Sequence, residues 1–178
     1  MDAFEKIIGQ LLEEENFWVR IGVKVNITKE EKRKIGKPSS PRPEIDIIAF
    51  DFKNNILYFL EAKSLIDSNG VDCKDVFCND NEQKGRYKIL TSENYQNIVS
   101  KRLHNDWFNK GLINEKTVIC FGLIAGKVYK NEEKKLRDYF NEKKWFFWGP
   151  TEIKERIEKL ANKGYENNEV TITAKLLK

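Results

Sequence analysis

The sequence predicts an α/β fold, in which helices flank a mixed central sheet. Segments with helical and with strand periodicity alternate along the chain in the order α-β-β-β-α-β-α-β-α, which is typical of a mixed-sheet α/β domain. The length of 178 residues suits one hydrophobic core, so we expect a single domain over residues 1–178.

The first half of the chain supplies one predicted helix and three strands. Residues 2–15 carry an apolar stripe at helical spacing, behind Asp2 as a candidate N-cap. Residues 17–27 are predicted to form the first strand. Residues 44–52 and 56–64 are rich in β-branched and aromatic side chains and predict a hairpin, with Asn54-Asn55 as its two-residue turn.

The second half begins with a polar stretch, residues 65–91, for which no element is predicted. The remaining pattern predicts helices at 92–110, 132–143 and 151–163, a buried strand at 117–123 and a short buried strand at 145–148. Residues 170–177 are interpreted as a further edge strand.

Composition excludes several classes of protein. Hydrophobic residues make up 40% and charged residues 34% of the chain, as in ordinary globular proteins. No apolar run approaches the roughly 20 residues that cross a bilayer. The N-terminus has no basic region followed by an apolar stretch, so no secretory signal is predicted and a cytoplasmic location is expected.

The three cysteines, an odd number, argue against a disulfide framework. Cys73, Cys78 and the single histidine, His104, leave open a zinc-stabilised interaction protein, although no fourth ligand is evident. A cysteine or serine nucleophile with a histidine base would depend on His104 alone.

Positive charge is concentrated in one segment. Residues 26–43 carry six basic and two acidic side chains, and the remaining 26 basic and 26 acidic residues balance. The Gly, Pro and Ser content predicts an exposed loop that can reach a phosphate backbone, and a solvated surface loop is the alternative. The candidate nucleic-acid-binding residues are Lys32, Arg33, Lys34, Lys37 and Arg42. Arg86, Lys101 and Arg102 would extend that surface.

Three charged side chains stand inside the two strands of the hairpin. If Asn54-Asn55 is the turn, Asp46 lies opposite Lys63 of the other strand. Glu61 is two residues before Lys63 on that strand. Opposed positions, and positions two apart, share a face of the sheet, so the three groups should meet. Charges in apolar strands are costly unless they are paired or bind a metal. A turn longer by one residue would break this register.

These residues fit the chemistry of phosphodiester hydrolysis. Two carboxylates with open positions suit Mg²⁺, which keeps several waters and contacts substrate phosphate. The metal polarises the phosphoryl group and lowers the pKa of bound water, while a lysine positions or deprotonates that water.

The strings Pro43-Glu44-Ile45-Asp46 and Glu61-Ala62-Lys63, separated by fourteen residues, resemble the PD-(D/E)XK nuclease superfamily. Its restriction-endonuclease-like αβββαβ core corresponds to about residues 1–125, with an αβα addition at the C-terminus. Pro43 departs from the pattern because it is not adjacent to the acid, and the metal ligand is therefore assigned to Asp46. The resemblance implies a DNA endonuclease that uses Mg²⁺ or Mn²⁺ through Asp46 and Glu61, with Lys63 as the catalytic lysine and a homodimer as a plausible assembly.

Further positions follow from the same resemblance. Many members carry an acid on the first helix near the metal, and Glu5 fits best, although Asp2 and Glu5 also make a capping box. Glu44 is a candidate accessory acid. Some members carry a glutamine and a tyrosine after the motif, which Gln83 and Tyr87 match by spacing. Gln96 is the competing glutamine, and a surface amide is the alternative for both.

Two other interpretations stay open. Asp46 and Lys63 alone would make a plain cross-strand ion pair. A non-catalytic module that binds nucleic acid or a partner can also retain such a fold.

Overall fold

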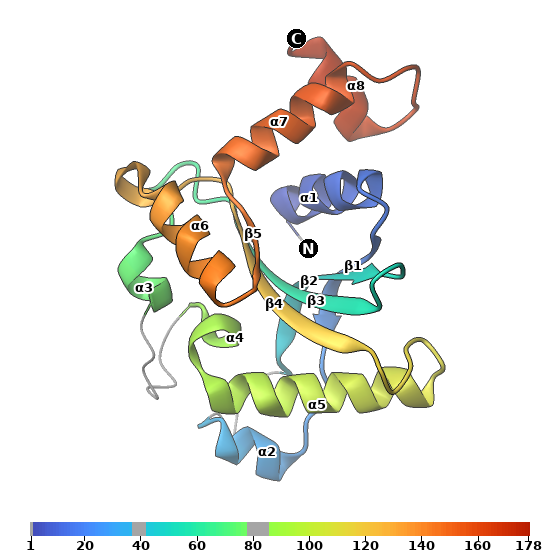
Figure 1. Ribbon diagram of the computed structural model, residues 1–178, viewed down its shortest axis with the longest axis vertical. Helices are drawn as coiled ribbons and strands as arrows, with labels where there is room; N and C mark the ends of the chain where they lie inside the picture. The colour runs from blue at the N-terminus through green and yellow to red at the C-terminus, as the bar shows by residue number, and fades with distance from the viewer. Residues whose placement is uncertain (1, 37–41, 78–85) are drawn as a thin grey trace.

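A mixed five-stranded open sheet forms the centre of the protein, as the sequence predicts (Figure 1). The computed structural model describes residues 2–36, 42–77 and 86–178. The strands are β1 (Trp18–Lys24), β2 (Glu44–Asp51), β3 (Ile56–Lys63), β4 (Val118–Ala125) and β5 (Phe146–Trp148), and they lie in that order. The pairs β1–β2 and β2–β3 are antiparallel, whereas β3–β4 and β4–β5 are parallel.

Helices cover both faces of the sheet (Figure 1). One layer contains α1 (Ala3–Glu14), α7 (Pro150–Ala161) and α8 (Glu169–Leu176). The other contains α3 (Cys73–Phe77), α4 (Lys88–Thr91), α5 (Glu93–Asn109) and α6 (Glu133–Glu142), while α2 (Lys29–Lys34) lies beyond α5. A 3-10 turn, η1 (Tyr129–Asn131), precedes α6. The polar stretch without a predicted element thus contains α3 and α4.

Strand residues alternate between two hydrophobic clusters. Leu57 and Phe59 pack with α5 and α6, while Leu60 and Ala62 pack with α1 and α7. This period of two fixes which side chains of β3 share a face. Glu61 therefore lies on the face of Phe59, toward α4 and α5.

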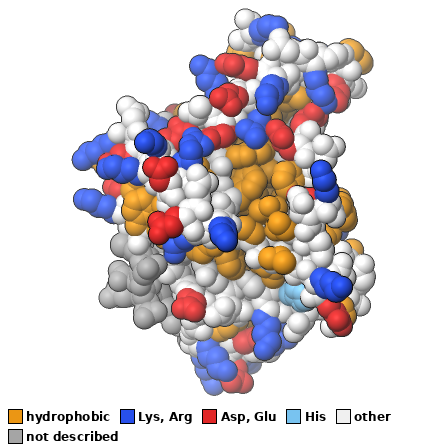
Figure 2. All heavy atoms as spheres, in the orientation of Figure 1, with side chains coloured by type: hydrophobic (Ala, Val, Ile, Leu, Met, Phe, Trp, Pro, Cys, Tyr) orange, Lys and Arg blue, Asp and Glu red, His pale blue; other side chains and the backbone are white. Residues whose placement is uncertain are grey.

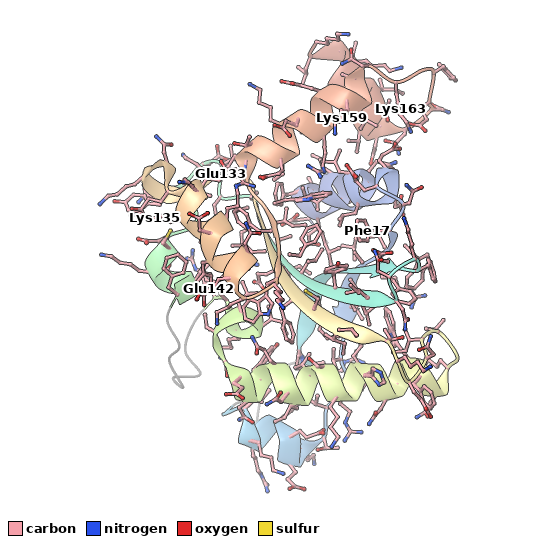
Figure 3. The ribbon with its side chains drawn as sticks, in the orientation of Figure 1. Phe17, Glu133, Lys135, Glu142, Lys159 and Lys163 are labelled. Atoms are coloured by element: carbon pink, nitrogen blue, oxygen red, sulfur yellow. The ribbon has the colours of Figure 1, made fainter. Side chains whose placement is uncertain are left out.

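Polar contacts connect the helices around this core. Asp2 and Glu5 form the capping box at the start of α1. Lys163, just after α7, forms an ion pair with Glu14 of α1, and Glu133 of α6 accepts a hydrogen bond from the Thr151 hydroxyl at 2.9 Å (Figure 3). These contacts join α7 to α1 and to α6, on either side of β5.

The hairpin turn is longer than predicted. Asp51 pairs with Ile56, so residues 52–55 form a four-residue turn in place of Asn54-Asn55 alone. The Asp51 carboxylate accepts hydrogen bonds from the Asn54 amide at 3.0 Å and from its side chain at 2.6 Å. Asn55 supplies the left-handed conformation that closes the turn, with φ of 55°. The Asp51 side chain is thus the reason that pairing stops early.

The predicted edge strand at 170–177 is wrong, because these residues form α8. The Asn168 side chain accepts hydrogen bonds from the amides of Val170 and Thr171 and caps the helix. Val170 and Ala174, one helical turn apart, both face the neighbouring helices, whereas a strand would alternate. Tertiary packing therefore overrides the β-branched composition.

Hydrophobic side chains gather on the surface between α1 and α5 (Figure 2). On the face of the sheet that α1 covers, the partly exposed rings of Phe17, Tyr58 and Phe146 pack edge to face, with centroids 5.2 to 6.2 Å apart. Among the described residues, no helix is long and apolar enough to cross a membrane.

Candidate active site

The site lies where β2 and β3 separate. Their ladder ends at the pair Ile47–Leu60. Beyond it, the amide of Ala62 donates a hydrogen bond of 3.0 Å to Asp46 Oδ2 in place of a backbone carbonyl. The Asp46 side chain therefore continues the hairpin by one bond and is fixed at the fork between the two strands.

Asp46, Glu61 and Lys63 meet at this fork. Lys63 Nζ lies 2.8 Å from Asp46 Oδ2 and 2.6 Å from Glu61 Oε1. The three side chains are 19%, 14% and 26% exposed, so the cluster is neither a surface ion pair nor sealed from solvent.

The predicted register at this site is wrong by two residues, but the predicted shared face is correct. Ile48 pairs with Phe59, so the continuation of the ladder places Asp46 opposite Glu61 and not opposite Lys63. The turn is longer by two residues, and an even change leaves every side chain on its face.

Gly22 shapes the strand beside Asp46. It lies between the paired positions Ile21–Ile47 and Val23–Ile45, opposite Asp46 in this register, and has φ of 65°. Ile21 packs toward α1, but Val23 packs toward α5, so the alternation of β1 reverses at Gly22. The left-handed backbone, which favours glycine, thus adjoins the site.

The surroundings shift the proton equilibria of the cluster. Burial, followed by the charge of Asp46, raises the pKa of Glu61 to about 7, against the opposing effect of Lys63. Both carboxylates together raise the pKa of Lys63 above its ordinary value despite its burial. The lysine is therefore held as an ammonium ion between the two acids.

Glu5 approaches the same cluster from α1. Burial raises its pKa, and Asp46 acts in the same direction, while Glu5 in turn raises the pKa of Glu61. The capping box with Asp2 is present as well. The two interpretations of Glu5 from the sequence are thus compatible: one side chain caps α1 and adds negative charge near the site.

A cleft of about 190 Å³ opens over the two acids. Its other walls come from Glu44 and Ile45 of β2 and from four residues at the α4–α5 junction, Arg86, Lys88, Ile89 and Tyr95. Glu44 also forms an ion pair with Lys24 at 3.9 Å. Lys88 and Tyr95 are absent from the sequence prediction, because neither belongs to a motif.

The two glutamine candidates differ in outcome. Gln96 donates a hydrogen bond of 2.8 Å to the Ile89 carbonyl, so it fixes the α4–α5 junction and is not a loose surface amide. Gln83 lies outside the described residues. Its predicted partner Tyr87 is buried, and desolvation raises the pKa of its hydroxyl to about 12.

Part of the basic segment is a helix, because residues 29–34 form α2 and not the loop that the sequence predicts. Thr28 caps α2 through the Glu31 amide, and Glu31 forms an ion pair with Arg102 of α5 at 3.0 Å. The Lys34 carbonyl accepts a hydrogen bond from Asn94. Local capping and this docking therefore prevail over the Gly, Pro and Ser signal that follows α2.

The other basic candidates are less constrained. Arg33 is exposed, and Lys34 pairs with Glu30 at 3.1 Å along α2. Arg42 donates to Asn26 at 2.8 Å. Lys37 lies outside the described residues.

The cysteine and histidine candidates do not converge where they are described. The Cys73 thiol contacts the Glu132 carbonyl, and burial raises its pKa to about 11, which disfavours a thiolate. The His104 ring stacks on Phe108 of its own helix. Cys78 lies outside the described residues. Over 2–36, 42–77 and 86–178, no three His, Cys, Asp or Glu side chains are grouped to hold a metal ion.

The donor set at the fork suits a hard cation nonetheless. Mg²⁺ is commonly bound through one or two carboxylates, with waters and substrate phosphate as its other ligands. Asp46 and Glu61 supply two such carboxylates at the edge of an open cleft. Both carboxylates already contact one positive charge, the ammonium group of Lys63.

Comparisons with protein-family models, with curated proteins and with solved structures find no match to this chain.

Proposed function

We propose that this protein is a metal-dependent nuclease, a DNA endonuclease with Asp46 and Glu61 as metal ligands. The observation that carries the proposal is the convergence of both acids and Lys63 at one partly buried fork. The antiparallel β1–β2–β3 unit, preceded by α1 and followed by α5 and the parallel β4, supports a restriction-endonuclease-like core.

The protein's own groups would divide the work. Mg²⁺ or Mn²⁺ bound there would supply Lewis-acid activation of the phosphoryl group and of a water. Asp46 is held in place by the Ala62 amide, so its position does not depend on the cation. Glu61 must be ionised to act as a ligand, and its raised pKa makes this a function of pH near neutrality.

Lys63 is assigned as a donor and not as a base. Its pKa is raised by both acids, so its ammonium group stays charged. From this position it can donate hydrogen bonds to a water or to a phosphate oxygen and offset developing negative charge.

A cleavage assay tests the proposal. Purified protein is incubated with linear, branched and single-stranded DNA and with RNA, in Mg²⁺ or Mn²⁺. Wild type should cut at least one substrate. Asp46→Asn and Lys63→Met should each lower the rate roughly 100-fold or more, as losses of catalytic electrostatic groups do.

The matched controls are Glu115→Gln and Lys116→Met, which remove one negative and one positive charge in an exposed turn. That turn precedes Val118, the partner of Ile56 at the opposite end of β3, and both controls should retain the wild-type rate. Equal rates in wild type and the site variants would assign the cutting to a contaminant. Nucleic-acid binding without cleavage would favour the non-catalytic module.

A further inference from the structure

The charge balance of the fork leaves a problem for a polyanionic substrate. Asp46, Glu61 and Lys63 sum to one negative charge, and Glu5 adds another nearby. The Lys63 ammonium group already contacts both carboxylates. Without a bound cation, a phosphate backbone approaching these groups would be repelled. A divalent cation at the fork would only cancel the two negative charges, so other cations along the path would supply the net attraction.

Arg86 and Lys88 line that path. Both border the cleft that contains Asp46 and Glu61. Between them Tyr87 is only 2% exposed, so the backbone there is anchored in the core while its two neighbours reach the cleft. Because the same cleft contains Asp46 and Glu61, this segment lies beside the fork.

Hydrogen bonds also connect this segment to α4 and α5. The Tyr87 carbonyl accepts hydrogen bonds from the amides of Leu90 at 2.8 Å and Thr91 at 2.9 Å. The Gln96 side chain of α5 binds the Ile89 carbonyl. The backbone that carries Lys88 and follows Arg86 is therefore tied by hydrogen bonds to α4 and α5.

The size and the charged walls of the cleft indicate which kind of ligand it can bind. At about 190 Å³ it is smaller than the roughly 300 Å³ at which pockets begin to enclose drug-sized ligands. Charged side chains make up most of its walls. A phosphate with its adjoining backbone matches these charged walls.

We propose that Arg86 and Lys88 form a clamp for the phosphodiester backbone of a nucleic-acid strand and hold it across Asp46 and Glu61. This inference rests on the proposed function, and it places the backbone contact nearest the chemistry at the start of α4. No residue of α2 lines this cleft, and Lys34 of α2 pairs with Glu30.

Fluorescence anisotropy with a short labelled DNA oligonucleotide tests the clamp, with Ca²⁺ in place of Mg²⁺ and over a series of salt concentrations. The double variant Arg86→Ala/Lys88→Ala should bind about 10- to 100-fold more weakly, and the slope of log affinity against log salt should fall by about 1 to 2. Arg86→Lys/Lys88→Arg should keep the wild-type slope. The control Lys110→Ala/Lys116→Ala removes two exposed charges elsewhere and should bind like wild type.

Hydrolysis in Mg²⁺ or Mn²⁺, measured in parallel, separates the two proposals. Clamp-dependent binding without hydrolysis would support the clamp and reject the nuclease. Hydrolysis by wild type, together with unchanged binding and salt slope in the alanine double variant, would overturn the clamp alone. Wild-type protein that binds no oligonucleotide would also overturn it.

Discussion

Glu61 is a residue whose protonation depends strongly on its surroundings. Its pKa of about 7 in the folded protein compares with an ordinary value of 4.5, because burial and Asp46 both oppose its charge. The folded state therefore binds a proton that the unfolded chain releases. That contribution to stability is complete below pH 4.5 and is lost as the pH rises through about 7.

Glu61→Gln should remove this dependence. In metal-free buffer, we expect the free energy of unfolding of wild type to fall by on the order of 2 kcal/mol, relative to the variant, between pH 4.5 and 8. Urea unfolding at several pH values measures it. Glu115→Gln, at an exposed position, should follow wild type. If the free energy of unfolding changed with pH in the same way for wild type and Glu61→Gln, the fork would not raise the pKa of Glu61.

At the scale of elements, the two strands of the hairpin carry the site and Gly22 of β1 shapes it. Gly22→Ala places an L side chain in the left-handed backbone region, which should lower the free energy of unfolding by about 1 to 2 kcal/mol. The added Cβ would also lie 3.2 Å from Glu44 Oε1. We expect lower thermal stability and a loss of cleavage activity beyond what the stability change explains, because Asp46 lies opposite.

Gly111→Ala is the matched control for that change. Gly111 has a similar φ of 69° at the end of α5, with open space around its missing side chain. It should lose comparable stability and keep its activity per folded molecule. Equal loss of activity in both variants would show that Gly22 has no specific role in shaping the site.

The sequence could predict the site because the side-chain period of a strand is two. An error of two residues in the register left Asp46, Glu61 and Lys63 on one face. Two helices, α8 and α2, could not be predicted from local periodicity because contacts with other segments stabilise them. Helix α8 has the Asn168 cap and packs against α7. Helix α2 has its capping box and the ion pair of Glu31 with Arg102. Local periodicity does not contain those contacts.

At the scale of the whole molecule, the order of elements predicted the mixed sheet but not what faces the fork. Arg86, Lys88 and Tyr95 reach the cleft only because α4 and α5 pack on the face of β3 that carries Glu61. No spacing along the chain encodes that approach. Arg86 was expected only as an extension of the basic surface, and Lys88 was not expected at all. The acids could thus be found from a motif, whereas the position of these two cations in the cleft required the tertiary structure.

The central claim is that Asp46 and Glu61 share a divalent cation, and a calorimetric titration with Mn²⁺ tests it most directly. Above pH 7, wild type should bind Mn²⁺ saturably. Asp46→Asn and Glu61→Gln should each weaken binding about 10-fold or more, whereas Glu115→Gln should bind like wild type. Mn²⁺ affinity that is unchanged in both site variants, or that is absent from wild type, would contradict the claim.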